Sequence, residues 1–273
     1  MTVASSQPVS AYQPFCSVYG PVHSWRYGRS LGIDPIGPIS TCSFDCVYCQ
    51  LGEIEHKTRD RRMLIPTQQI LQDLQPFAPW DVDVITLSGS GEPTLALNLG
   101  EILSAVKGLT QRPVGVLTNG SLLTQATVRQ ELSVADFVAV KVDALSPEQL
   151  RRIDRPVAGI DLMDIWRGLQ QFRQQYQGQL GIQSMLLAAW SDRDQLDYIA
   201  LMQDLGPDEI QLNTPTRPRP LIHQLEARGN GHTDPPSYTV RHLKPISQGF
   251  LQEFAHRLEQ AIGIPVRYPP LNS

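Results

Sequence analysis

Short apolar segments alternate with amphipathic segments between residues 67 and 213, and this alternation constrains the fold more than any other feature of the chain. Runs rich in Val, Ile and Leu predict strands, whereas apolar residues that recur every three or four positions predict helices. Strands that alternate with helices form a parallel sheet joined by right-handed crossovers. We expect strands at residues 31–36, 82–87, 114–117, 137–142, 180–187 and 209–212, and helices at 67–74, 97–109, 124–132, 161–176 and 247–262, with two more that begin near Ser146 and Ser191.

Six strand–helix units are two fewer than a closed eight-fold barrel contains. The alternative is a doubly wound open sheet, but no G-x-G-x-x-G sequence opens a helix, which disfavours a dinucleotide-binding fold. From residue 214 onward, prolines interrupt regular structure. We therefore expect an N-terminal arm (1–18), a core (19–215) and a proline-rich C-terminal extension (216–273) that includes the terminal helix.

The composition narrows the class of protein. The 273 residues are 41% apolar, enough for one large α/β core, and the net charge is −4 with a pI of about 5.9. This charge disfavours a globally basic nucleic-acid binder, although a local basic patch stays open. Four cysteines, three of them clustered, suit a reducing compartment and a metal. With no signal-peptide pattern and no apolar run long enough to span a bilayer, we expect a cytoplasmic protein without a membrane partner.

Three of the cysteines, Cys42, Cys46 and Cys49, have the spacing C-x3-C-x2-C. Three thiolates on a cubic [4Fe–4S] cluster leave one iron without a protein ligand, and an open metal position can bind a small molecule. The alternatives are a structural cluster and a zinc site. Zinc needs four ligands, and the nearest fourth candidates, Cys16 and His56, form no standard pair with the others. We assign Cys16 no role.

The cysteine spacing resembles that of the radical S-adenosylmethionine (SAM) superfamily. In that family the open iron chelates the amino nitrogen and carboxylate of SAM, and the aromatic residue before the third cysteine, here Tyr48, lies near the adenine. The resemblance implies an α/β fold with a partial (β/α)6 TIM-like barrel. It also implies two cofactors, a [4Fe–4S] cluster and SAM.

The resemblance extends to the ends of the expected strands, where function sits in parallel β/α barrels. Ser90-Gly91-Glu92 matches a Gly-Gly-Glu motif that binds the SAM amino group in the family, with Ser in place of the first Gly. The Ser hydroxyl would bond to the same group. Considered alone, this stretch is a turn with an exposed Glu. Thr118 and Asn119, followed by Gly, match a Thr-Asn-Gly sequence that the family places near the methionine part of SAM.

Four further polar residues lie on the last three expected strands. Lys141 and Asp143 alternate to the same side of their strand, so an ion pair inside the barrel is the plain interpretation. By resemblance, Asp143 holds a ribose hydroxyl of SAM. Gln183 and Asn213 are polar residues on apolar strands that need partners, and we include them as weaker cofactor-binding candidates.

The resemblance implies a radical SAM enzyme that reductively cleaves SAM at the cluster, giving a 5′-deoxyadenosyl radical that acts on an unidentified substrate. Its partner would be a one-electron donor such as a flavodoxin or ferredoxin. Residues 19–32, 46–52, 88–94 and 212–215 are most similar to the wyosine-synthase-like branch, which modifies tRNA. The alternatives are therefore a tRNA-modifying enzyme of that branch, with RNA as the substrate, and a non-catalytic metal-stabilised binding protein.

Arginines provide the candidates for substrate binding. Arg217 and Arg219 follow the last expected strand, and Arg59, Arg61 and Arg62 follow the cysteine loop. Together they would form a positive rim for a phosphate or carboxylate substrate, and the alternative is solvated surface. We name Arg217, together with Lys141, as the candidate catalytic residues.

Overall fold

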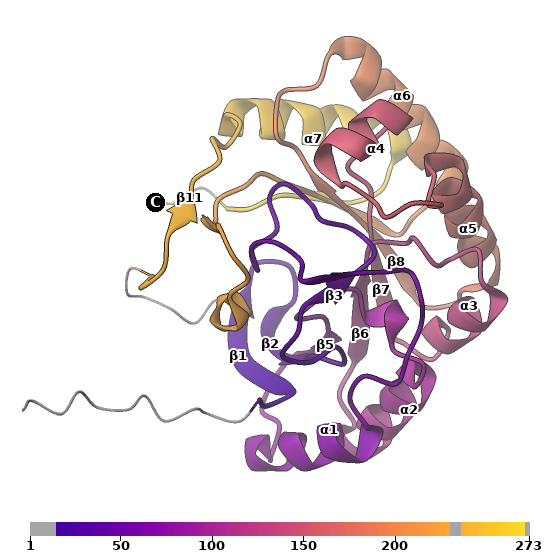
Figure 1. The fold of residues 1–273 in the computed structure, drawn as a ribbon. Coiled ribbons are helices and arrows are strands. Elements are labelled where there is room, and N and C mark those ends of the chain that lie inside the picture. Colours follow the sequence, from indigo (N-terminus) through magenta and orange to yellow (C-terminus); the bar gives the residue numbers. More distant parts are fainter. Residues whose placement is uncertain (1–14, 230–235, 271–273) are drawn as a thin grey trace, which may run out of the picture.

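The computed structural model describes residues 15–229 and 236–270, and its centre is an eight-stranded sheet curled into a partial barrel (Figure 1). The strand order is β1-β2-β5-β6-β7-β8-β9-β12. Every neighbouring pair is parallel except β1 and β2, which form an antiparallel hairpin. The strands are β1 (Val18–Ser24), β2 (Gly28–Ile33), β5 (Val84–Leu87), β6 (Val114–Thr118), β7 (Phe137–Lys141), β8 (Gln179–Met185), β9 (Glu209–Asn213) and β12 (Val266–Arg267).

The six strands from β2 to β9 confirm the predicted partial (β/α)6 barrel. Helices cover its outer side, and in the view of Figure 1 they run from α1 at the bottom to α7 at the top. Their buried residues recur at helical spacing, as in α5, where Leu162, Ile165, Trp166, Leu169 and Phe172 face the sheet side. The helices are α1 (Thr67–Leu74), α2 (Leu99–Thr110), α3 (Ala126–Leu132), α4 (Pro147–Ile153), α5 (Leu162–Gln175), α6 (Asp192–Leu205) and α7 (Gln248–Ile262).

Polar side chains fix where several elements begin and end. Ser146 caps α4 and Ser191 caps α6, the latter in a capping box with Asp194. The first core strand was expected at 31–36 but ends at Ile33. Buried Asp34 accepts hydrogen bonds from two backbone N–H groups that follow it, which turns the chain out of the sheet.

Both edge strands of the sheet were missed by sequence analysis. At one edge, β1 contains Gly20 and Pro21, which interrupt its register with β2. At the other edge, β12 has two residues and pairs with β9. Arg267 of β12 donates through Nη2 to the carbonyl oxygen of Trp25 at 2.7 Å, and Trp25 lies in the turn between β1 and β2. The first hairpin and the last strand are therefore linked directly.

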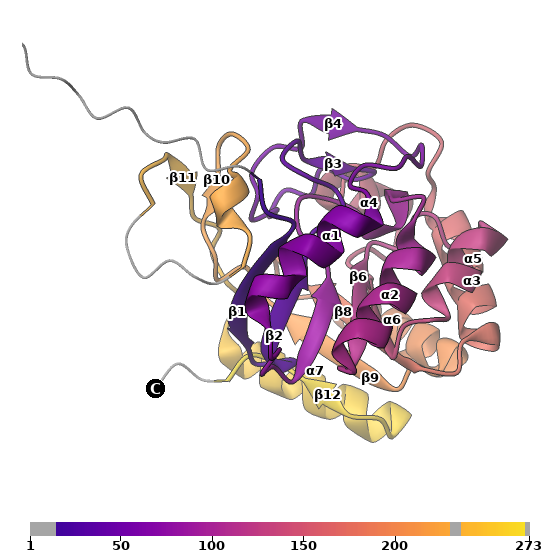
Figure 2. The same ribbon diagram turned by 90° about the horizontal axis from the view of Figure 1, so that it is seen from below.

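Two small sheets and three 3-10 turns complete the chain (Figure 2). The pair β3–β4 frames the cysteine loop, and the pair β10–β11 lies in the C-terminal extension. The strand β12 belongs to the expected C-terminal extension but joins the core sheet, so the expected division into residues 1–18, 19–215 and 216–273 stays a proposal. Residues 1–14 of the expected N-terminal arm lie outside the described residues. These elements are β3 (Thr41–Cys42), β4 (His56–Lys57), β10 (Arg219–Pro220), β11 (Val240–Arg241), η1 (Gln75–Phe77), η2 (Pro93–Leu95) and η3 (Leu225–Ala227).

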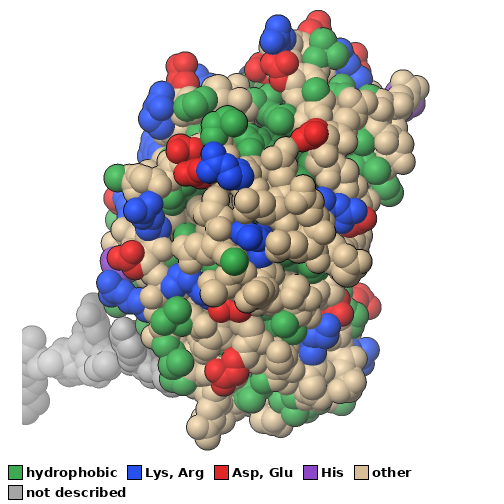
Figure 3. Space-filling model, turned by 90° about the vertical axis from the view of Figure 1, so that its right-hand side faces the viewer, with side chains coloured by type: hydrophobic (Ala, Val, Ile, Leu, Met, Phe, Trp, Pro, Cys, Tyr) green, Lys and Arg blue, Asp and Glu red, His purple; other side chains and the backbone are tan. Residues whose placement is uncertain are grey.

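The outer surface carries both basic and acidic side chains (Figure 3). Figure 3 shows basic and acidic side chains interspersed over the face at the right of Figure 1. Within residues 15–229 and 236–270, none of the helices is both long and apolar enough to cross a membrane.

Candidate active site

A cavity of about 880 Å³ lies inside the partial barrel and reaches the C-terminal ends of its strands. Parallel strands present these ends at one edge, so side chains far apart in sequence meet there. Among the predicted metal, cofactor-binding and catalytic residues, Ser90 alone does not line this cavity. The predicted residues that do line it are Cys42, Cys46, Tyr48, Cys49, Gly91, Glu92, Thr118, Asn119, Lys141, Asp143, Gln183, Asn213 and Arg217.

Backbone hydrogen bonds hold the cysteine loop against two other parts of the core. On one side, Thr41 N–H donates to the carbonyl of Ser90 at 3.0 Å, and Glu92 N–H donates to the carbonyl of Thr41 at 3.1 Å. On the other side, Val47 N–H donates to Ile153 at the end of α4, at 2.9 Å. The loop position is therefore set by the end of β5 and by α4.

Gly91 makes the first of these contacts sterically possible. A Cβ atom at this position would lie 1.7 Å from the carbonyl oxygen of Thr41, far inside any allowed contact. A glycine is required here because two backbones approach closely. The glycine thus brings Cys42, which follows Thr41, next to Glu92.

The three thiols are free, and each belongs to a half-buried residue that lines the cavity. The sulfur of Cys42 accepts from Phe44 N–H at 3.4 Å and from the Asn119 amide at 3.7 Å. Burial raises the pKa of all three thiols, so they are protonated at neutral pH and must release protons when they bind a metal. Cys16 is exposed and donates to the Val18 carbonyl, outside the cavity.

The donor set fits a cluster held by three cysteines. In the part of the chain that the structure describes, no three Cys, His, Asp or Glu side chains are close enough together to hold one metal ion. The three cysteines all line the same cavity. A cubic cluster takes each thiolate on a different iron, so its ligands stand further apart than those around one ion.

Glu92 joins the ends of β5 and β6. Its Oε1 accepts from Thr94 N–H at 3.1 Å and from the hydroxyls of Thr94 and Thr118, both at 2.6 Å. Its Oε2 accepts from Asn119 N–H at 2.7 Å. Burial raises the pKa of Glu92, and these hydrogen bonds oppose the rise. Oε2 takes a single donor from the described residues, so it has capacity for another.

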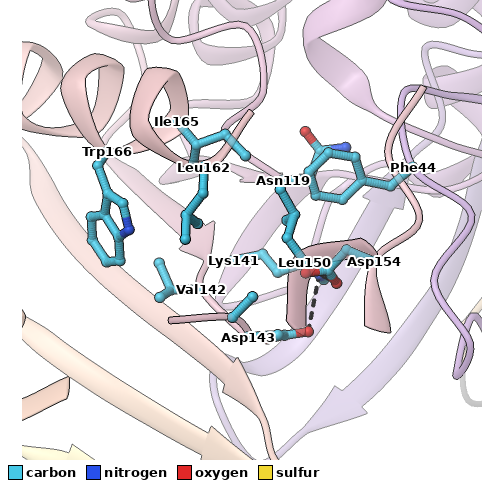
Figure 4. Close-up of a pocket in the computed structure, with 11 residues that line it drawn as sticks. Phe44, Asn119, Lys141, Val142, Asp143, Leu150, Asp154, Leu162, Ile165 and Trp166 are labelled. Atoms are coloured by element: carbon cyan, nitrogen blue, oxygen red, sulfur yellow. Dashed lines mark hydrogen bonds and ion pairs between the residues drawn. The ribbon is translucent and has the colours of Figure 1, made fainter. Parts of the chain in front are cut away.

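Lys141, Asp143 and Asp154 form a buried charge network beside the cysteine loop (Figure 4). The ammonium of Lys141 lies 3.0 Å from Asp143 and also pairs with Asp154. Tyr48 donates its hydroxyl to Asp143, and the Cys46 thiol donates to Asp154 at 3.7 Å. The expected ion pair between Lys141 and Asp143 is therefore present, and it contacts the cysteine loop twice.

Burial and ion pairing shift the pKa values of this network in opposite directions. It raises the pKa of Asp154 to about 6, against the attraction of Lys141. Burial lowers the pKa of Lys141, but Asp143 and Asp154 outweigh it and the net direction is upward. Lys141 is thus a fixed cation. Sequence analysis missed Asp154, because a carboxylate just after a short helix gives no sign that the helix end meets a distant loop.

The other predicted residues differ in where their polar atoms point. The hydroxyl of Ser90 donates to buried Asp34 at 2.6 Å and faces away from the cavity. The amide of Gln183 donates to Gln211 at 2.8 Å inside the barrel. Asn213 accepts from the following N–H through its own side chain.

Only one of the five predicted rim arginines lines the cavity. Arg217 lines the cavity and donates to the side-chain oxygen of Gln50. Arg59 donates to the Gly159 carbonyl, Arg61 pairs with Glu131, Arg62 bonds to residues 95 and 97 through its backbone, and Arg219 lies 3.9 Å from Asp45. The predicted rim is not assembled as one patch.

Comparisons with known proteins agree with this geometry. The family model described as "Radical SAM superfamily" matches residues 36–202, more than half of the chain. UPF0026 protein slr1464 of Synechocystis sp. is 57% identical over 259 residues, covering 94% of this chain and 97% of that protein. UPF0026 protein MJ1312 of Methanocaldococcus jannaschii is 34% identical, covering 73% of this chain and 64% of that protein.

Among solved structures, "Native anSMEcpe with bound AdoMet" superposes with a TM-score of 0.58 at 15% identity, over 88% of this chain and 63% of that one. That likeness concerns the fold alone. The family match and the relatives lead to one conclusion. The chain belongs to the radical SAM superfamily of enzymes, which bind a [4Fe–4S] cluster and S-adenosylmethionine.

Proposed function

We propose that the cavity is one active site in which SAM is reductively cleaved and a substrate is held beside it. The observation that supports this most strongly is that three thiols and a buried carboxylate line one cavity at the ends of successive strands. A volume of about 880 Å³ is near the upper end of ligand sites, about 300–1,000 Å³, so it suits a cofactor with a small substrate.

In this proposal Cys42, Cys46 and Cys49 hold the cluster. Bound there, the cluster would provide the one-electron reduction that cleaves a carbon–sulfur bond of SAM into methionine and a 5′-deoxyadenosyl radical, which would take a hydrogen atom from the substrate. The electron comes from a one-electron donor such as a flavodoxin or ferredoxin. That partner and a cytoplasmic location stay predictions from the sequence.

The protein side chains bind and orient. Oε2 of Glu92 would accept a hydrogen bond from the SAM ammonium, since it has a free acceptor position and faces the cavity. Asn119 would contact the methionine part, because its backbone and amide already join Glu92 to Cys42. The side chain of Thr118 is bonded to Glu92, so it would act through that carboxylate.

Tyr48 and Asp143 would hold the nucleoside part of SAM. Their mutual hydrogen bond fixes the tyrosine ring on the cavity wall, where it would lie against the adenine. Asp143 would reach a ribose hydroxyl. Lys141 is committed to two carboxylates, so it would act as a positioning residue. Gln183 and Asn213 would face the substrate side.

Ser90 and Gly91 would support the SAM site without a side-chain contact to SAM. The hydroxyl of Ser90 bonds to Asp34, and Gly91 lets the cysteine loop approach. The segment between β5 and η2 would then present Ser88, Glu92 and backbone groups to the cavity.

Anaerobic reconstitution tests this function. Iron, sulfide, SAM and dithionite are added, and deoxyadenosine is measured by chromatography. Wild-type protein should form it, and Cys42→Ala should not. A protein that loads iron and binds SAM but forms no deoxyadenosine under any reductant would rule out reductive cleavage.

Sequence analysis left two alternative functions, a non-catalytic binding protein and a tRNA-modifying enzyme. Membership in a superfamily of enzymes argues against a non-catalytic metal-stabilised binding protein. Assignment to the wyosine-synthase-like branch, with tRNA as the substrate, stays a prediction. Stimulation of deoxyadenosine formation by purified tRNA, with steep dependence on salt, would favour it.

A further inference from the structure

The turn between β1 and β2 forms part of the cavity wall. Trp25, Arg26 and Tyr27 all line the cavity, together with Pro269 and Pro270 after β12. The bond from Arg267 to the Trp25 carbonyl holds this turn against the last strand. Residues next to the two edge strands of the sheet therefore meet on this side of the cavity. None of these residues belongs to the proposed SAM contacts.

Arg26 in this turn has a guanidinium without a carboxylate partner in the described part of the chain. Its Nε is buried and makes no hydrogen bond. The guanidinium lies over the ring of Trp25, with 4.6 Å between its central carbon and the ring centroid. Burial lowers the pKa of Arg26 to about 10, and the charge of Arg217 adds to this. A desolvated cation with unused donors is costly unless an anion binds it.

Arg217 reaches the same cavity from the segment after β9. Its Nη1 donates to two neutral acceptors, the side-chain oxygen of Gln50 and the carbonyl of Gly229 at 3.4 Å. Within residues 15–229 and 236–270, no carboxylate lies within ion-pair distance of this guanidinium. Arg26 and Arg217 line the same cavity, and the charge of Arg217 contributes to the lowered pKa of Arg26.

The remaining charged residues of the cavity wall do not balance these two arginines. Lys141 and Asp143 are paired with each other. Glu92 accepts four hydrogen bonds and would face the SAM ammonium. Neither Arg26 nor Arg217 therefore has a carboxylate of the described residues in ion-pair contact.

We propose, on the basis of the proposed function, that the substrate is a small molecule with a carboxylate or phosphate group that Arg26 and Arg217 bind together. A planar guanidinium matches both oxyanions in a bidentate geometry. The Trp25 ring holds Arg26 from behind, so the unused donors stay oriented. The oxyanion would fix the end of the substrate, leaving its other end beside SAM.

The position of these arginines favours a small molecule over RNA. Arg26 belongs to a turn that lines the cavity and its Nε is buried, whereas RNA binding uses cations spread over an open surface. The outer arginines that would form such a surface are engaged, Arg61 with Glu131 and Arg59 with a backbone carbonyl. The net charge of −4 points the same way.

The test is a titration of the anaerobic, cluster-loaded protein with inorganic phosphate and, separately, acetate, by calorimetry. Wild type should bind at least one of them, and the better probe identifies the oxyanion. Arg26→Gln and Arg217→Gln should each weaken binding about tenfold or more, because each removes a charge-assisted hydrogen bond. Arg26→Lys, which keeps the charge but not the planar fork, should recover part of the loss.

Arg29→Gln is the matched control. Arg29 is on the same hairpin, is 43% exposed and pairs with Asp81 outside the cavity, so its loss changes the net charge equally. It should bind phosphate and acetate as wild type does. Equal affinity in all of these proteins, equal loss in Arg29→Gln, or no binding of either probe by wild type would overturn the proposal.

Two further measurements separate this inference from the proposed function. SAM binding is measured on the same samples by calorimetry. The anion titration is carried out both with and without SAM, so a protein that fails to bind SAM can still be tested for anion binding. Deoxyadenosine formation is then compared with a small-molecule filtrate of cell extract before and after anion-exchange depletion. Stimulation should vanish on depletion. Stimulation that survives depletion, or that only the RNA fraction gives, would refute an anionic small substrate.

Discussion

Replacing Gly91 with alanine should displace the cysteine loop without unfolding the barrel. The added Cβ would lie 1.7 Å from the Thr41 carbonyl oxygen, whereas ordinary contacts begin at 3.4 Å. The backbones at Gly91 and Thr41 must therefore move apart by roughly the difference between these two distances. Both hydrogen bonds between Thr41 and the segment from Ser90 to Glu92 would be strained or lost.

The cost can be estimated from these contacts. Overpacking of this kind costs about 1–3 kcal/mol, and two hydrogen bonds contribute about 0.5–1.5 kcal/mol each. The total of about 2–6 kcal/mol is below the free energy of unfolding of many domains, about 5–15 kcal/mol. The variant should fold, with a melting temperature lower by roughly 5–20 °C. Because Cys42 follows Thr41 directly, the iron content per chain should fall more than the fraction of folded protein does.

The assay measures iron and sulfide per chain, visible absorbance and thermal unfolding after anaerobic reconstitution. Gly108→Ala is the control, since Gly108 lies in α2 with nothing within 4 Å of an added Cβ. That change should stabilise the protein by about 0.5–1 kcal/mol and leave iron loading unchanged. Wild-type iron loading and melting temperature in Gly91→Ala would refute the role given to this close approach.

Three other predictions follow from the same site. Alanine at Cys42, Cys46 or Cys49 should abolish the visible absorbance of the reconstituted protein, whereas Cys16→Ala should leave it unchanged; loss of the cluster in Cys16→Ala alone would contradict the three-cysteine model. Glu92→Gln should weaken SAM binding about ten- to a hundredfold by calorimetry with iron content unchanged, because an amide cannot replace a charged acceptor; equal SAM affinity would count against this contact. Lys141→Met should destabilise the protein by about 3–5 kcal/mol in thermal unfolding, because two buried carboxylates lose their counter-ion; a change within 0.5 kcal/mol would show that the network is not needed for stability.

Local patterns were sufficient for the core of the fold. The helix expected at 67–74 spans Thr67–Leu74 in the structure, and the strand expected at 137–142 spans Phe137–Lys141. These elements bury one face or are buried throughout, and their periodicity follows from that burial. The edge strands gave no such signal. β12 is two residues long, and β1 contains a Gly-Pro pair, so their pairing depends on tertiary contacts.

The candidate site was predictable to the extent that it lies at strand ends. Glu92, Asn119 and Asp143 were named as candidates because their positions resemble motifs of the radical SAM superfamily and follow the C-terminal ends of parallel strands, which share one edge. Asp154 and Arg26 were missed for a common reason. One follows a helix and the other lies in a hairpin turn, and only the folded chain brings Asp154 to the cysteine loop and Arg26 to the cavity.

A buried ion pair between Asp34 and Arg228 connects the proposed SAM side of the cavity with the proposed substrate side. Asp34 is fully buried and accepts from the backbone and hydroxyl of Ser90 and from Arg228 at 2.8 Å. Arg228 belongs to the same segment as Arg217, and Gly229 next to it accepts from Arg217. The segment after β9 is therefore tied to the end of β5 through one carboxylate. Breaking a buried ion pair is strongly destabilising, because it leaves a buried charge without a partner. The segment that contains Arg217 and the loop that contains Glu92 should therefore keep a fixed position relative to each other. Such a relation would place an oxyanion bound at Arg217 at a constant distance from SAM, which a radical reaction requires if it is to take one hydrogen atom among several.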